Sequence, residues 1–266
     1  MKINWSDWNP FKRKYKVAFC FNGGGARTTA YLGAYDFLYS KGVRPVGFVA
    51  QSAGSLVAIS LALGIDSIKT RDFFRTFSIK QHVDGLPLPL VNQESLHDYF
   101  KTFVPDQDLS LFEPPIYLAA IELNSARLEY LHQSVRTVDA VMATSALPGI
   151  IGPYSIGDKR YVDGGFIKGS DAAFAKRVFP GRPVIEFDVS GHNGFFFFRE
   201  MAVKAIDLIE GGVATEDSRE EKPDYHLHFN NILGGTFSPD QMDENYEAGY
   251  KAAEAAWPEI KAMLES

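Results

Sequence analysis

Ser52 stands at a predicted strand-to-helix corner, where a hydroxyl can act as a nucleophile. Residues 45–50 form an apolar run of strand length, and residues 56–63 are long enough for a buried helix. Such a corner turns the hydroxyl out of the sheet and places it at a helix N-terminus, which favours developing negative charge. Ser52 is therefore the candidate nucleophile, although Ala50 replaces the first glycine of the G-x-S-x-G pattern. The alternative is that Ser52 only caps a helix beginning at Ala53.

A glycine-rich loop precedes this corner in the chain. Three consecutive glycines follow the strand-like residues 17–21 and lead into the helix-like residues 29–38. Their unshielded N–H groups can hold a phosphate or the oxyanion of ester hydrolysis. The nucleotide-binding pattern G-x-G-x-x-G fails because Thr28 occupies its last position. We therefore interpret the loop as an oxyanion hole formed by Gly23, Gly24, Gly25, Ala26 and Arg27.

Asp163 is the candidate general base. It follows a short strand and precedes Gly164 and Gly165, and a tight turn there can aim its carboxylate at a neighbour. The alternative is structural, because Asp-Gly is also a common hairpin turn.

Together these stretches resemble the patatin-like phospholipases, a family of serine lipid acyl hydrolases that use a Ser-Asp dyad. The resemblance rests on residues 23–27, 51–54, 143–150 and 163–165. Their order and spacing match the family from about residue 17 to residue 165. The sequence departs from the family pattern at Asn22, Thr28 and Ala50, and it lacks Asn-x-Pro after the Asp-Gly-Gly turn.

The resemblance implies hydrolysis of fatty-acyl esters by a phospholipase A-type reaction. Asp163 would take the proton of Ser52, whose oxygen attacks the ester carbonyl, and the glycine-rich loop would stabilise the oxyanion. The implied substrate is a phospholipid or another fatty-acyl ester. The implied reaction uses no metal and no other cofactor.

The composition is that of an ordinary soluble globular protein. The chain has 266 residues, of which 45% are hydrophobic and 23% charged, and its net charge of -6 argues against nucleic-acid binding. We expect a cytoplasmic protein, because neither a Sec signal peptide nor a transmembrane segment is recognisable. The single cysteine, Cys20, lies in an apolar strand and is expected to be a buried thiol.

Helix-length and strand-length segments alternate along the chain. Strands are predicted at residues 17–21, 45–50, 116–121, 127–132, 184–189 and 225–229 and in the segment that ends at Asp163. Helices are predicted at residues 29–38, 56–63, 67–77, 94–103, 137–145, 172–179 and 199–209 and from residue 241 onward. This alternation predicts one α/β domain, residues 17–266, with a mainly parallel sheet sandwiched between helices. All three motifs follow strands, as expected for a site at the carboxyl ends of parallel strands.

Residues 1–16 form an N-terminal arm in which aromatic and basic side chains are concentrated. Trp5, Trp8 and Phe11 precede the cationic residues of the segment 12–16. Aromatic and cationic side chains favour the lipid headgroup region, so one interpretation is peripheral contact with a membrane. The other is that the aromatic side chains pack on the domain.

Three rival interpretations remain. A Ser-His-Asp triad needs a late histidine. His192, His226 and His228 are available, and His192 is the best placed because it follows a strand. A metal site could use His226 and His228, which share one face of a strand, but no third ligand with suitable spacing stands out and none is predicted. A patatin-like scaffold could also bind lipid or protein without catalysis. The dyad is favoured because the elbow lies early in the chain, directly after a glycine-rich loop.

Overall fold

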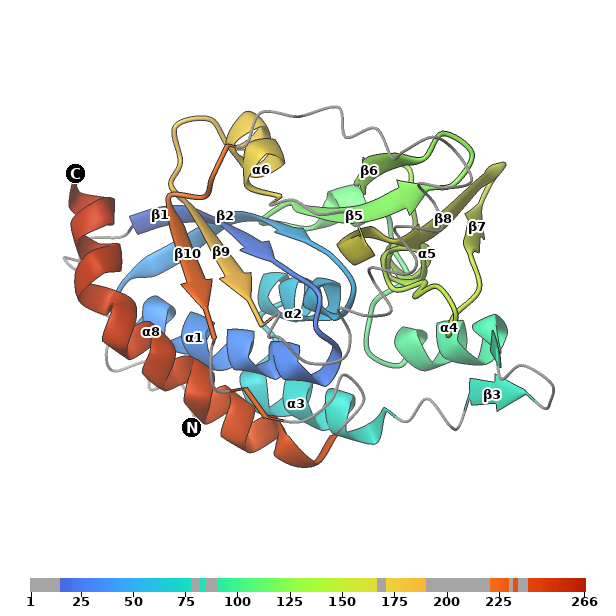
Figure 1. The fold of residues 1–266 in the computed structure, drawn as a ribbon, viewed down its shortest axis with the longest axis horizontal. Helices are drawn as coiled ribbons and strands as arrows, with labels where there is room; N and C mark the ends of the chain where they lie inside the picture. Colours follow the sequence, from blue (N-terminus) through green and yellow to red (C-terminus); the bar gives the residue numbers. More distant parts are fainter. Residues whose placement is uncertain are drawn as a thin grey trace.

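A mixed sheet runs through the centre of the structure, a computed structural model that describes residues 15–77, 82–84, 90–166, 171–189, 221–229, 232–233 and 239–266 (Figure 1). Within these residues the sheet has eight strands, in the order β10, β9, β1, β2, β5, β8 and β7, with β6 paired to β5. The strands are β1 (Tyr15–Phe21), β2 (Val43–Ala50), β5 (Ile116–Glu122), β6 (Arg127–Leu131), β7 (Tyr154–Ile156), β8 (Lys159–Asp163), β9 (Val184–Asp188) and β10 (Tyr225–His228). A separate antiparallel pair joins β3 (Val83–Asp84) to β4 (Leu90–Val91).

The strand directions confirm the predicted mainly parallel sheet. All pairings from β10 through β9, β1 and β2 to β5 are parallel. The pairings of β5 with β6 and β8, and of β8 with β7, are antiparallel. The carboxyl ends of β1, β2 and β9 therefore meet at one edge of the sheet, where the glycine-rich loop follows β1 and Ser52 follows β2. Asp163 instead ends β8, which is antiparallel to β5, so the expectation that all three motifs follow parallel strands is wrong for Asp163.

Helices cover both faces of the sheet, which confirms the predicted sandwich (Figure 1). Helices α1, α2 and α8 lie on one side of the strands and α6 on the other. The α-helices are α1 (Thr29–Ser40), α2 (Ala53–Ala62), α3 (Ser67–Thr76), α4 (Gln93–Lys101), α5 (Thr137–Thr144), α6 (Ala172–Val178) and α8 (Met242–Glu265). Short 3-10 turns are η2 (Gly25–Thr28), η4 (Leu109–Leu111), η5 (Gly164–Phe166) and η6 (Pro239–Gln241). None of the helices in the described ranges is both long and apolar enough to cross a membrane.

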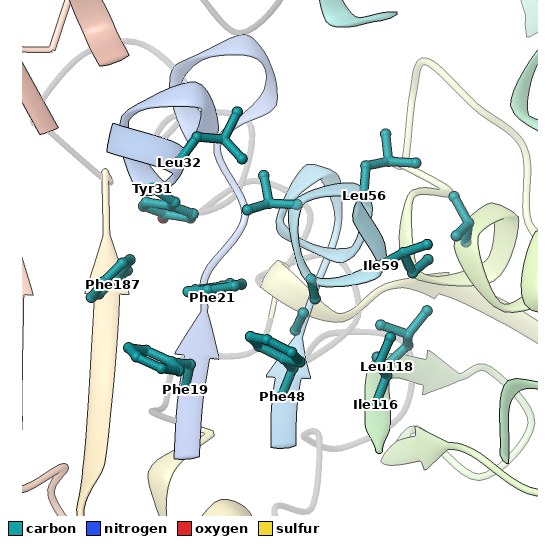
Figure 2. Close-up of a cluster of buried hydrophobic side chains, with 14 of the residues drawn as sticks. Phe19, Phe21, Tyr31, Leu32, Phe48, Leu56, Ile59, Ile116, Leu118 and Phe187 are labelled. Atoms are coloured by element: carbon teal, nitrogen blue, oxygen red, sulfur yellow. The ribbon is translucent and has the colours of Figure 1, made fainter. Parts of the chain in front are cut away.

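Aromatic side chains fill the core between the sheet and α1. Phe19 and Phe21 of β1 lie between Phe48 of β2 and Phe187 of β9, as Figure 2 shows. Tyr31 of α1 stacks on Phe21, with ring centroids 5.5 Å apart. Because alternate residues of a strand point to opposite faces, β1 directs its large residues to this side. The packing fixes the end of β1 against the start of α1, and the glycine-rich loop lies between them.

Small residues form the core on the opposite face. Ala18 and Cys20 of β1 pack against Ala172 and Ala175 of α6. Cys20 is fully buried, as predicted, and burial raises the pKa of its thiol. Small side chains allow α6 to lie close to the sheet on this side.

Two glycines allow α1 and α8 to cross closely. A Cβ at Gly33 would overlap the carbonyl group of Tyr246, and a Cβ at Gly249 would overlap that of Ala30. Both positions therefore need glycine while the helices stay this close. Aromatic contacts extend the interface, and the hydroxyl of Tyr246 donates to Asp36 Oδ2 over 2.8 Å.

Some of the predicted boundaries differ from the observed ones. Residues 147–157, for which we predict neither a helix nor a strand, contain β7, which pairs with β8. With three residues, β7 is too short for an alternating pattern to be recognised. Strand β1 begins at Tyr15, so the last two residues of the predicted arm belong to the sheet. Residues 1–14 and the predicted helix 199–209 lie outside the described residues.

Candidate active site

Ser52 occupies the corner between β2 and α2. Its φ of 52° and ψ of -136° lie in a region that residues other than glycine rarely adopt. Gly54 permits the sharp turn, because a Cβ there would lie 2.6 Å from the carbonyl oxygen of Phe21. The Ser52 side chain makes no capping hydrogen bond to α2, so the capping interpretation is wrong.

Thr144, the last residue of α5, holds the backbone of this corner. The N–H of Ser52 lies 3.2 Å from the carbonyl oxygen of Thr144 and 3.0 Å from its Oγ1. The Thr144 hydroxyl in turn donates to the carbonyl oxygen of Ala119 in β5 over 2.5 Å. Sequence reasoning did not assign a role to Thr144, although it belongs to the segment 143–150 that resembles the family. The contacts of Thr144 therefore stabilise the strained backbone of Ser52 and link it to β5.

The glycine-rich loop lies directly against Ser52. A Cβ at Gly23 would be 2.9 Å from Cβ and 3.6 Å from Oγ of Ser52. Gly24 packs on Val189, the residue after β9, and a Cβ at Gly24 would overlap that side chain. Gly25 has a φ of 60°, which favours glycine. Among the described residues, no hydrogen bond uses the N–H groups of Gly24 or Gly25, so both can serve an anion beside Ser52.

Arg27 supports this loop from within the protein. Its side chain is buried, and Nε donates to the carbonyl oxygen of Gly24 over 3.2 Å. Burial lowers the pKa of the Arg27 guanidinium. Asn22 ties the loop to the serine corner, because its Oδ1 accepts a hydrogen bond from Gln51 Nε2 over 3.2 Å. These contacts fix the loop relative to Ser52.

Asp163, the last residue of β8, is buried beside Ser52. The Ser52 side chain lies close enough to this carboxylate to interact with it and to favour its charged form. The N–H of Gly165 donates to Asp163 Oδ1 over 2.8 Å. The chain continues from Gly164 as the 3-10 turn η5, so the hairpin interpretation of this segment is wrong. Antiparallel pairing of β8 with β5 thus brings a residue 111 positions away in the sequence to the serine.

Burial raises the pKa of the Asp163 carboxyl to about 6, while the interaction with Ser52 and the hydrogen bond from the Gly165 N–H act in the opposite direction. At neutral pH the carboxylate therefore predominates. A buried group whose pKa lies just below the working pH is ionised and still basic enough to take a proton. The arrangement can draw a proton from the Ser52 hydroxyl and hold negative charge on the loop N–H groups.

The histidines of the rival triad are placed differently. His226 and His228 lie on β10, on the other side of β1 from β8 in the strand order. His192 lies outside the described residues. Of the predicted residues, the structure brings together Ser52, Asp163 and the glycine-rich loop.

Comparison with known proteins agrees with this architecture. Residues 19–175, more than half of the chain, match the family described as patatin-like phospholipase. VipD from Legionella pneumophila superposes with a TM-score of 0.52 at 14% identity, over 95% of this chain and 67% of VipD. ExoU from Pseudomonas aeruginosa, in its complex with SpcU, gives a TM-score of 0.46 at 13% identity, over 96% of this chain and 53% of ExoU. Human GIVD cytosolic phospholipase A2, in complex with methyl gamma-linolenyl fluorophosphonate, gives a TM-score of 0.49 at 12% identity, over 94% of this chain and 58% of the human chain.

The likeness to VipD shows a shared fold, and this chain spans little more than half the length of the other two structures. The family match includes the glycine-rich loop, the serine corner and Asp163, which are the segments that converge in space. On these grounds the chain belongs to the patatin-like phospholipase family.

Proposed function

We propose that this protein hydrolyses fatty-acyl esters of lipids in a phospholipase A-type reaction, with Ser52 as nucleophile and Asp163 as general base. Membership of the family supports a lipid hydrolase acting on phospholipids or related esters. The observation that carries the residue assignment is the convergence of the Ser52 side chain and the buried Asp163 carboxylate, which are close enough to interact. No cofactor enters the proposed reaction.

In the first step Asp163 takes the proton of Ser52 as Oγ attacks the ester carbonyl. The N–H groups of Gly24, Gly25 and Ala26 stabilise the oxyanion, and one such donor contributes about 3 to 4 kcal/mol. When the tetrahedral intermediate collapses, the leaving alcohol receives the proton from Asp163, and the acyl group stays on Ser52. Asp163 then activates a water molecule, which releases the fatty acid and restores the serine hydroxyl.

The test compares wild type with Ser52→Ala on phospholipid vesicles, with released fatty acids and lysolipids measured by mass spectrometry. We expect product from wild type and none above background from Ser52→Ala. A fluorophosphonate probe should label wild type and leave the variant unlabelled. Ser60→Ala is a matched control, because Ser60 is also in α2 and its hydroxyl donates a hydrogen bond to the carbonyl oxygen of Val57.

Labelling or hydrolysis that persists in folded Ser52→Ala would show that another residue is the nucleophile. A wild-type protein that is folded but neither labelled nor active on vesicles or soluble esters would instead indicate the non-catalytic scaffold. The two results are distinct, so the experiment separates a wrong residue from a wrong activity.

We further propose that the N-terminal arm contacts anionic membranes. The proposal rests on the sequence, where three aromatic residues precede Lys12, Arg13, Lys14 and Lys16. Each cation near an anionic surface contributes about 1 kcal/mol. Deleting residues 2–11 and neutralising the four cations should weaken co-sedimentation with anionic vesicles, and unchanged co-sedimentation would refute it.

A further inference from the structure

Two histidines of the edge strand β10 lie beside carboxylates of β9. The parallel register pairs His226 with Glu186 and His228 with Asp188. Because alternate residues share one face of a strand, all four side chains lie on the same face, opposite to Phe187 in the core. The sequence supplied two histidines without a third ligand, and the neighbouring strand provides it.

The distances fit a metal ion. Asp188 Oδ2 lies 3.6 Å from His226 Nε2 and 3.6 Å from His228 Nδ1. One ligand atom from each residue lies within 4.8 Å of the other two. A tetrahedral ion bound at about 2.0 to 2.1 Å separates its ligand atoms by about 3.4 Å. The two distances from Asp188 to the imidazoles are therefore already close to the spacing that such an ion requires, and the two imidazole nitrogens lie within 4.8 Å of each other.

We propose that Asp188, His226 and His228 form a binding site for a divalent transition-metal ion, with Zn²⁺ as the best match. Two imidazoles and one carboxylate are a ligand set that suits Zn²⁺ and its neighbours in the first transition row, whereas Mg²⁺ and Ca²⁺ prefer oxygen ligands. The remaining coordination positions would be filled by water.

Glu186 adds a second feature of metal sites. When His226 binds through Nε2, its Nδ1 faces Glu186 Oε2 at 3.9 Å. A carboxylate on the far nitrogen of a metal-binding histidine orients the ring and increases its basicity. At 3.9 Å the pair is not yet hydrogen-bonded, and a small rotation of the His226 ring toward Glu186 would complete a carboxylate–histidine–metal arrangement.

Access and charge agree with this site. The side chains of His226 and His228 are 47% and 38% exposed, so an ion can enter from solvent. Glu186 and Asp188 provide two negative charges, and Arg27 contributes one positive charge that also acts on Asp188. With neutral imidazoles, the local charge is negative and favours a cation.

The test uses untagged, metal-free protein titrated with Zn²⁺ by calorimetry and with Co²⁺ by visible absorption. We expect one ion per chain, Co²⁺ bands typical of low coordination number, and a higher unfolding temperature with Zn²⁺. His226→Ala and His228→Ala should each weaken Zn²⁺ binding more than tenfold. Glu186→Gln should weaken it about 10- to 100-fold.

Two variants serve as controls. His97→Ala removes a histidine whose Nε2 lies 3.4 Å from Asp139 Oδ1. Among the described residues, this pair has no third side chain placed to share a metal ion. The His97→Ala variant should therefore bind Zn²⁺ like wild type. Ser52→Ala should also bind normally, because the readout does not depend on hydrolysis. The failure of this proposal is therefore separable from failure of the proposed enzyme activity.

Absence of Zn²⁺ binding by wild type, or equal binding by folded His226→Ala and His228→Ala, would overturn the proposal. Circular dichroism establishes that the variants are folded. If an alanine variant does not fold, His228→Gln keeps the side-chain volume and tests the same ligand, and its undiminished binding would equally contradict the site.

Discussion

Replacing Asp163 by asparagine should abolish activity and at the same time stabilise the protein at neutral pH. Asparagine keeps the shape and can still accept the N–H of Gly165, but it cannot take a proton from Ser52. Loss of a general base typically costs about 10²- to 10⁴-fold in rate. The opposite signs of the two effects separate a catalytic loss from a folding defect.

The stability gain follows from the pKa of Asp163. Burial raises this pKa from 3.8 to about 6, so the folded state binds the proton more tightly than the unfolded state. The extra stability that this proton gives the folded state is fully present below about pH 3.8 and is lost as the pH rises through 6. Above pH 6 the buried charge costs about 3 kcal/mol, taken as 1.36 kcal/mol for each of about 2.2 pKa units. The uncharged amide of the Asp163→Asn variant would carry no such cost.

The assay is urea unfolding of wild type and Asp163→Asn at pH 5 and pH 8, alongside esterase rates. The variant should be more stable by up to about 3 kcal/mol at pH 8, and by about half of that at pH 5. Wild-type activity should fall on acidification with an apparent pKa near 6, because protonation removes the base.

Asp106→Asn is the matched control. The hydrogen bond from Arg136 lowers the pKa of the Asp106 carboxyl. The stability that the Asp106 carboxylate gives the folded protein is therefore present above the unfolded pKa and is lost on acidification. The Asp106→Asn change should therefore leave the protein no more stable at pH 8. If Asp163→Asn is equally stable or less stable at pH 8, the argument from burial is refuted. If the folded variant keeps more than a few per cent of the rate, Asp163 is not the base.

Three further substitutions test the packing of the site. Gly24→Ala should lower the urea midpoint, because overpacking against Val189 costs about 1 to 3 kcal/mol of stability. Adding Val189→Ala to the same chain should restore much of this lost stability. If the effects of the two substitutions simply add in the double variant, the contact is contradicted. Ser52→Gly should be more stable than Ser52→Ala by about 1 kcal/mol, because relief of a 1 to 3 kcal/mol strain exceeds the extra chain entropy of glycine; equal urea midpoints would argue against strain. A glycine-to-alanine change usually stabilises a helix, but Gly249→Ala should destabilise this protein by about 1 to 3 kcal/mol, because the new Cβ meets the carbonyl group of Ala30. A higher melting temperature of Gly249→Ala would refute the close crossing of α1 and α8.

The main parts of the site could be predicted because each has a local signature. Ser52 is bracketed by an apolar strand and an apolar helix, and the glycine-rich loop follows another buried strand. Asp163 was identified by its glycine neighbours together with the resemblance, since Asp-Gly alone equally predicts a hairpin. The parallel sheet followed from the alternation of helices and strands, which is a property of the whole chain.

The remaining contacts join segments that no local pattern connects. Thr144 reaches Ser52 because α5 ends beside β2, and Val189 covers Gly24 because β9 lies next to β1. The third ligand at Asp188 depends on the register of β9 with β10. These relations depend on strand order and register, which local sequence patterns do not determine.

The pairing of β1 with β9 has a consequence for synthesis of the chain. β1 ends at Phe21, and β9 begins at Val184. At about 5 to 20 residues per second, on the order of 10 to 30 seconds pass between the emergence of the two strands. During that interval one hydrogen-bonding edge of an apolar strand lacks its final partner, and such edges promote aggregation. The nascent chain should therefore depend on chaperones until its last third is made, and slow translation upstream of β9 should lower the soluble yield.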